Sequence, residues 1–170
     1  MSLAPKNASA QFGYYEIRGM MIYHFGRFVT WPERVFNAEN KIVLGILGDD
    51  PFGASIDDIL RNRRIRGRTW EVKRGNSLND LKGSHIIFVT QSKRNEIKEI
   101  FEELNSSKYR RTNILTIGDN IDDFCRYGGV MNVDRNNFFT INSDAANKAN
   151  LIIDSRLWQM AKQIESYGNK

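Results

Sequence analysis

The sequence predicts an α/β fold with three layers, doubly wound around a mostly parallel sheet, with a C-terminal antiparallel hairpin at one edge. Continuous apolar runs at residues 41–48, 85–90 and 113–117 are typical of strands that are buried on both faces. Helical spacing of apolar residues between these runs indicates parallel strands with right-handed crossovers. Two further runs, at residues 130–133 and 138–142, are joined by so short a turn that they must pair antiparallel.

The first predicted element is a helix that ends before Trp31-Pro32, because a residue that precedes proline avoids the helical conformation. Its apolar residues recur at helical spacing and form one broad stripe. The stripe consists of Ile17, Met20, Met21, His24, Phe25 and Phe28. We expect residues 1–13 to be a flexible N-terminal segment and residues 14–166 to form a single domain, since no linker or repeat divides the chain.

Further helices are predicted at residues 54–61 and 93–104, with a short one at 119–124. Residues 69–74 alternate between apolar and polar side chains, which is typical of a half-exposed strand. The chain is expected to end in helix from about residue 143, restarting near Asp154. The residues of this helix expected to face inward are Leu157, Met160, Ala161 and Ile164.

The 170-residue chain has a net charge of +5, and much of the excess lies in an arginine-rich stretch at residues 61–68. Such a stretch can serve nucleic acid, an anionic ligand or an acidic protein surface, or it can simply be a solvated loop. No run approaches the roughly 20 apolar residues that span a bilayer. The first residues lack the charged and apolar regions of a signal peptide, so we expect export only if this peptide has already been removed.

Polar residues follow three of the predicted strands. Asp49 and Asp50 come after the first, Thr90 and Gln91 after the third, and Asp119 after the fourth. Ligands of open α/β sheets gather at the carboxyl ends of strands, near the point where strand order reverses. We therefore expect these residues to line a cleft, although the same side chains can instead cap the helices that follow.

Arg64, Arg66 and Arg68 precede the half-exposed strand. A guanidinium offers a planar fork of donors that suits carboxylate or phosphate. If one or two of these arginines point into the mouth of the cleft, an anionic ligand is expected there. If they all point outward, they are solvent charges or part of a partner surface.

Catalytic and metal chemistry find little support in the sequence. His24, His85 and the single Cys125 do not have the spacing of zinc ligands, and no glycine-rich phosphate loop is present. The neighbouring carboxylates of Asp57-Asp58 and Asp122-Asp123 diverge by about 100° on a helix, so neither pair can act on one bond. We expect a protein that is not an enzyme and that needs no metal or cofactor.

The order and spacing of several short motifs resemble the YfiR/HmsC-like family over roughly residues 14–166. They include the aromatic run 25–32 ending in Trp-Pro, the strand and turn 46–53, and the segment 114–119. Gly67-Arg68, residues 85–89, Gly128-Gly129, residues 139–142 and the C-terminal segment 145–157 continue the resemblance.

This resemblance implies an α/β fold, export to the periplasm, a tendency to dimerise and a regulatory role without catalysis. The family members that are best understood hold an inner-membrane diguanylate cyclase inactive, which lowers cyclic di-GMP and biofilm formation. Some members also carry paired cysteines. Because this chain has only Cys125, we expect no redox control through an internal disulfide.

Three functions therefore remain under consideration. The first is a periplasmic regulator that binds an inner-membrane sensor protein, a diguanylate cyclase or a histidine kinase. The second is a small-molecule binding module for an anionic or aromatic metabolite. The third, a nucleic-acid binder, is the least favoured because the aromatic residues stand in apolar runs, so we expect no nucleic acid among the partners.

Overall fold

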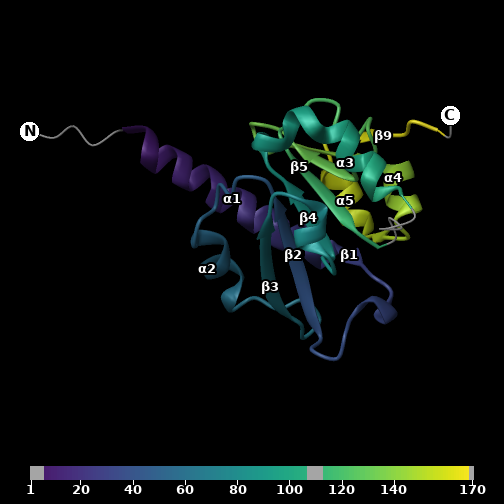
Figure 1. The fold of residues 1–170 in the computed structure, drawn as a ribbon, viewed down its shortest axis with the longest axis horizontal. Coiled ribbons are helices and arrows are strands. Elements are labelled where there is room, and N and C mark those ends of the chain that lie inside the picture. The colour runs from purple at the N-terminus through teal and green to yellow at the C-terminus, as the bar shows by residue number, and fades with distance from the viewer. Residues whose placement is uncertain (1–5, 107–112, 169–170) are drawn as a thin grey trace, which may run out of the picture.

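The structure is a computed structural model that describes residues 6–106 and 113–168, and the side chains from residue 13 onward. Helix α1 begins at Lys6, ahead of residue 14 where we expected the domain to start, and its first turns extend away from the rest of the molecule (Figure 1). The helices are α1 Lys6–Phe28, α2 Ser55–Arg61, α3 Ile97–Leu104, α4 Ser143–Lys148 and α5 Ser155–Met160. Short 3-10 helices are η1 Glu33–Val35, η2 Leu78–Leu81 and η3 Gln91–Glu96.

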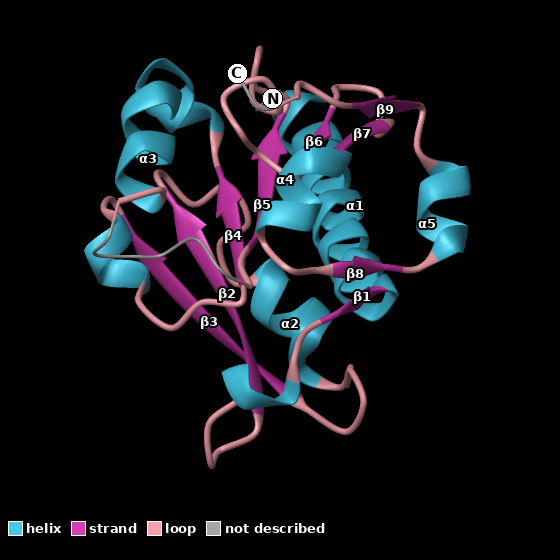
Figure 2. Ribbon diagram, turned by 90° about the vertical axis from the view of Figure 1, so that its right-hand side faces the viewer, coloured by secondary structure: helices cyan, strands magenta, loops and turns pink. Residues whose placement is uncertain are grey.

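Seven strands form the main sheet in the order β3-β2-β4-β5-β6-β7-β9. They are β2 Lys41–Leu47, β3 Thr69–Gly75, β4 Ile86–Val89, β5 Leu115–Asp119, β6 Met131–Val133, β7 Phe139–Asn142 and β9 Gln163–Glu165. All neighbours are parallel except β6 and β7, which form the predicted hairpin. A separate pair, β1 Val29–Thr30 and β8 Ile152–Ile153, lies beside α1 (Figure 2). The mixed, mostly parallel α/β fold is therefore confirmed.

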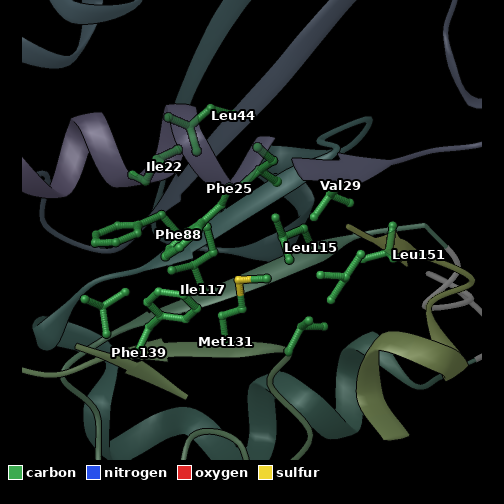
Figure 3. Close-up of a cluster of buried hydrophobic side chains, with 14 of the residues drawn as sticks. Ile22, Phe25, Val29, Leu44, Phe88, Leu115, Ile117, Met131, Phe139 and Leu151 are labelled. Carbon is green, nitrogen blue, oxygen red and sulfur yellow. The ribbon is translucent and has the colours of Figure 1, made fainter. Parts of the chain in front are cut away.

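Two apolar clusters show that helices cover both faces of the sheet. On one face, α1 and α2 pack on the sheet with Phe25, Ile56 and other residues, joined by Leu157 of α5. Figure 3 shows Phe25 of this cluster together with Phe88 and Ile117 from the sheet. On the other face, α3 contributes Phe101 and its neighbours. Strand β4 supplies both clusters from alternate positions, since Phe88 lies in the first cluster and Ile87 in the second. This explains why its sequence is apolar throughout.

Helix α1 packs through a face that coincides only in part with its predicted apolar stripe. Its buried residues include Arg18, Ile22 and Phe25, whereas Ile17 is 49% exposed. Two glycines mark the places where α1 is closely approached by its neighbours. A Cβ on Gly26 would lie 2.7 Å from a side-chain atom of Ile65, and Gly19 is similarly close to α2. Periodicity counts large apolar residues, so it misses a packing face that includes glycine and a buried arginine.

Two other sequence predictions were wrong. The C-terminal helix α5 ends at Met160 and does not continue to Ile164. The side chains of Met160 and Ile164, which we expected to face inward, are largely exposed. The backbone N–H of Lys162 donates to the carbonyl of Phe139, which places the following residues beside β7 as the edge strand β9. The short helix predicted at residues 119–124 is also absent, since Asp119 ends β5 and a series of turns follows.

Candidate functional site at the carboxyl ends of the strands

The structure does not bring together the eight residues that the sequence singled out. Asp49, Asp50, Thr90, Gln91 and Asp119 lie at the carboxyl ends of β2, β4 and β5. Arg64, Arg66 and Arg68 precede β3, which runs parallel to β2, so they lie at the amino ends of the strands. The ends of a seven-residue strand such as β2 are roughly 20 Å apart. These arginines therefore cannot reach a ligand at the carboxyl ends.

Intramolecular contacts occupy much of the arginine-rich stretch. Arg68 is buried, its Nη2 lies 2.5 Å from Oε2 of Glu33, and its guanidinium carbon lies 3.7 Å from the centre of the Phe36 ring. Arg66 donates a hydrogen bond of 2.6 Å to a threonine hydroxyl at the end of β1. Only Arg64 is left with a single long bond, of 3.5 Å, to a nearby carbonyl. Through these contacts, Arg66 and Arg68 connect the segment before β3 to residues 30–36 at the amino end of the sheet.

The turn after β2 is also held by its own contacts. Oδ1 of Asp50 accepts the backbone N–H of Phe52 at 2.8 Å, and Oδ2 accepts from Nε of Arg74 at 2.6 Å. Arg74 also reaches Asp57 at 2.5 Å, which ties α2 to β3. Asp50 therefore has a structural role in this turn, while the exposed Asp49 side chain lies outside these contacts.

The crevice expected where strand order reverses, between β2 and β4, is crowded at Gly48. A Cβ on Gly48 would lie 2.4 Å from both Oγ1 of Thr90 and Oγ of Ser92. The Ser92 hydroxyl also accepts the backbone N–H of Asp49 at 2.8 Å. Gly48 has a φ of 107°, a conformation that favours glycine, so the chain passes directly under these hydroxyls. The Thr90 and Ser92 side chains therefore occupy the space next to Gly48.

A buried ion pair joins β5 to α1. Nε of Arg18 lies 3.2 Å from Oδ1 of Asp119, and the two side chains are 0% and 1% exposed. Tyr15 donates from its hydroxyl to Oδ2 of Asp119 at 3.1 Å, and Nη2 of Arg18 donates to the carbonyl of Asp134 at 2.7 Å. Arg18 also contacts the Tyr14 hydroxyl, whereas its buried Nη1 has no hydrogen-bond partner among the residues that the structure describes. Asp119 thus anchors α1 to the sheet.

Burial dominates the electrostatics of this network. It raises the pKa of Asp119, although the adjacent Arg18 guanidinium acts in the opposite direction. Burial also raises the pKa of Tyr15, and the nearby Asp119 carboxylate adds to the effect. Arg18 cannot be recognised as buried from the sequence, because a single arginine among apolar residues looks like a solvent-facing side chain.

Beside this network a polar pocket of about 430 Å³ opens at the ends of β4 and β5. We call it the strand-end pocket. Its lining consists of Gln91, Arg94, Asn95, Asn120, Ile121, Asp122 and Arg135. Gln91 is the one predicted residue that lines it, and its amide donates to the backbone carbonyls of Asp119 and Asn120.

A larger and mostly apolar groove of about 1150 Å³ lies between α1 and α2. We call it the α1–α2 groove. Its lining consists of Gly13, Glu16, Ile17, Met20, Met21, His24, Pro51, Phe52, Gly53, Ala54, Ser55, Asp58 and Ile59. The apolar stripe that the sequence predicted for α1 therefore exists, but much of it faces this groove instead of the core.

The side chains of His85 and Cys125 are buried inside the fold. Nδ1 of His85 accepts the backbone N–H of Val43 at 2.9 Å, its ring stacks on Phe36, and burial lowers its pKa. Burial raises the pKa of the Cys125 thiol to about 12. In the described residues, no three His, Cys, Asp or Glu side chains come together so that they could hold a metal ion. No helix in the same residues is long and apolar enough to cross a membrane.

Comparison with known proteins gives two findings. The model of a family described as YfiR/HmsC-like matches residues 15–162. A solved structure described as the ABC domain in complex with L-Trp from Streptococcus pneumonia is similar in fold, with a TM-score of 0.52 and 13% sequence identity. The similarity covers 75% of this chain and 56% of that one. No curated protein sequence is similar enough to this chain to count as a match.

Proposed function

The chain belongs to the YfiR/HmsC-like family, and on this premise we propose that it is an exported periplasmic regulator of a membrane signalling protein. The family is regulatory and non-catalytic, and it is associated with the periplasm and with diguanylate cyclase signalling. The observation that carries the proposal is the extent of the match, from α1 to the residue before β9. The partner is the periplasmic part of an inner-membrane diguanylate cyclase, and the readout is cellular cyclic di-GMP.

A surface suited to such a partner lies at the β9 edge of the sheet. Phe138, Met160 and Ile164 are 53%, 63% and 55% exposed, and we call them the β9-edge patch. In the sheet order, β9 pairs with β7 on one side and ends the sheet on the other. An unpaired edge offers backbone donors and acceptors to an added strand, and exposed apolar side chains beside it favour protein contact.

Co-expression tests the function directly. The chain, directed to the periplasm by a signal peptide, is produced together with an inner-membrane diguanylate cyclase from the same organism. We expect cyclic di-GMP to change several-fold and the tagged chain to purify with the cyclase from detergent. Unchanged cyclic di-GMP together with no copurification would refute the proposal.

A matched pair of variants tests the proposed surface. Ile164→Asp places a charge in the β9-edge patch and should abolish both copurification and the change in cyclic di-GMP. Ile152→Asp is the control, because Ile152 is also exposed, at 69%, but lies on β8, outside the main sheet. Equal loss in both variants would show that the patch is not the contact surface.

We also propose that the protein forms a homodimer in which the N-terminal turns of α1 from one copy lie in the α1–α2 groove of the other. Two features support this. The groove leaves apolar residues such as Met20 and Met21 incompletely covered. The first turns of α1 extend away from the molecule (Figure 1), and isolated helical turns of this length are marginal in water. A two-fold arrangement covers both features at once.

Sedimentation tests this arrangement. We expect a dimer for the natural chain and a monomer for Met20→Asp, which places a charge in the groove. Ile152→Asp is again the control and should remain dimeric. A monomeric natural chain at the highest soluble concentration would refute the proposed dimer.

A further inference from the structure

The strand-end pocket lies where parallel α/β sheets commonly bind ligands, although not at the expected crevice. Thr90 and Ser92 crowd the end of β2 at Gly48, and the strand-end pocket lies one strand further along the sheet, at the carboxyl ends of β4 and β5. Its walls come from η3, from the residues after β5 and from the turn between β6 and β7. A volume of about 430 Å³ lies toward the small end of the range for ligand pockets.

The charges of the pocket are not neutralised. Arg94 and Arg135 both line it, and in the described parts of the chain no carboxylate oxygen lies within 4.0 Å of either guanidinium. Other arginines of this molecule, such as Arg68 and Arg74, do have such partners. Asp122 is the one carboxylate in the lining, so two positive charges face one negative charge.

Hydrogen bonds and the buried Arg18–Asp119 ion pair hold the backbone around the pocket in place. The Gln91 amide is bonded to the carbonyl of Asp119, whose carboxylate pairs with the buried Arg18. Arg18 also donates to the carbonyl of Asp134, the residue that precedes Arg135. Backbone on two sides of the pocket is therefore tied to one buried side chain. A recognition site needs this kind of support, because binding then costs less ordering.

We propose that the strand-end pocket binds a small organic anion that carries a carboxylate or phosphate group, with Arg94 and Arg135 as its charged contacts. A guanidinium presents a planar fork of donors that matches an oxyanion. Nη1 of Arg94 already donates to the carbonyl of Gln91 at 3.1 Å, so its other N–H groups are the ones that we propose contact the ligand. The amides of Asn95 and Asn120 supply further donors and acceptors around the ligand, while Asp122 limits how much negative charge it can carry. This site is separate from both the β9-edge patch and the α1–α2 groove.

Calorimetric titration in a buffer without phosphate tests the site. The probes are succinate, citrate and inorganic phosphate, and succinamide is the uncharged counterpart of succinate. We expect saturable binding of at least one anion with a dissociation constant of about 1 mM or tighter, and none of succinamide. Preference among the three anions distinguishes a carboxylate from a phosphate. Saturable binding of none of them, or equal binding of succinamide, would overturn the proposal.

Variants identify the contacts. Arg135→Ala and Arg94→Ala should each weaken binding by about 10-fold or more, as expected for the loss of a charged hydrogen bond. Asp122→Asn should strengthen it, and a gain cannot arise from misfolding. The control is Arg64→Ala, which removes the same charge at the other end of the sheet and should leave binding unchanged. Equal weakening by Arg64→Ala would reduce the effect to net charge and refute the site.

The outcome is independent of the proposed regulator role. Calorimetry uses the purified chain alone, whereas the regulator role is read from cyclic di-GMP in cells. Loss of ligand binding in Arg135→Ala with an intact cyclic di-GMP response therefore bears on the pocket alone.

Discussion

The ion pair between Arg18 and Asp119 should contribute most of its stability through the cost of leaving either charge unpaired. The side chains are 0% and 1% exposed, so neither can turn to solvent when its partner is removed. Breaking such a pair by removing one partner costs about 3–5 kcal/mol. We expect a cost in this range for Arg18→Met, which also removes the hydrogen bond to the carbonyl of Asp134.

The double variant separates the pair from its surroundings. Arg18→Met with Asp119→Leu leaves neither charge buried, so its cost should be smaller than the sum of the two single variants by about 2 kcal/mol or more. The assay is urea unfolding at pH 7 followed by circular dichroism, with thermal unfolding as a second measure. For a domain of this size, a loss of 3 kcal/mol corresponds to a fall in Tm of about 6–12 °C.

An exposed pair provides the control. Arg61 and Asp58 approach to 2.7 Å, but their side chains are 68% and 62% exposed, so Arg61→Met should cost less than about 1 kcal/mol. If the two single variants at Arg18 and Asp119 have additive effects, the charges are not coupled and the reasoning fails. It fails equally if Arg18→Met costs no more than Arg61→Met.

Three further predictions concern buried side chains. Burial lowers the pKa of His85 from its ordinary value of 6.5, so the unfolded chain binds this proton more readily and stability should fall as the pH drops below about 6.5. His85→Asn keeps an acceptor for the backbone N–H of Val43 and should flatten this dependence in urea melts at pH 5 to 8. Phe88→Ala empties the centre of the core and should cost about 3–5 kcal/mol in the same melts. Cys125, buried with a pKa of about 12, should react with iodoacetamide much more slowly in the native protein than in urea, and equal rates would contradict its burial.

The candidate site was partly predictable. The carboxyl ends of the strands could be located from the sequence, because each buried strand is an apolar run followed by polar residues. Gln91 was found in this way, and it lines the strand-end pocket. Arg94 and Arg135 were not, because nothing in an exposed arginine between ordinary polar residues shows that it borders a cavity. Arg64, Arg66 and Arg68 drew attention by their density, yet they lie at the other end of the sheet.

The local sequence was sufficient to predict the buried parallel strands and the hairpin. Burial on both faces produces a continuous apolar run, and a hairpin requires a short polar turn, so both can be recognised within one segment. The face on which α1 packs, the edge strand β9 and the buried Arg18 were decided only by tertiary contacts. Glycine lets neighbouring segments approach closely, the pairing of residues 163–165 with β7 directs the C-terminal segment along the sheet edge, and Asp119 makes the burial of an arginine tolerable. Each of these depends on a partner distant in the sequence, and no pattern within one segment can contain that partner.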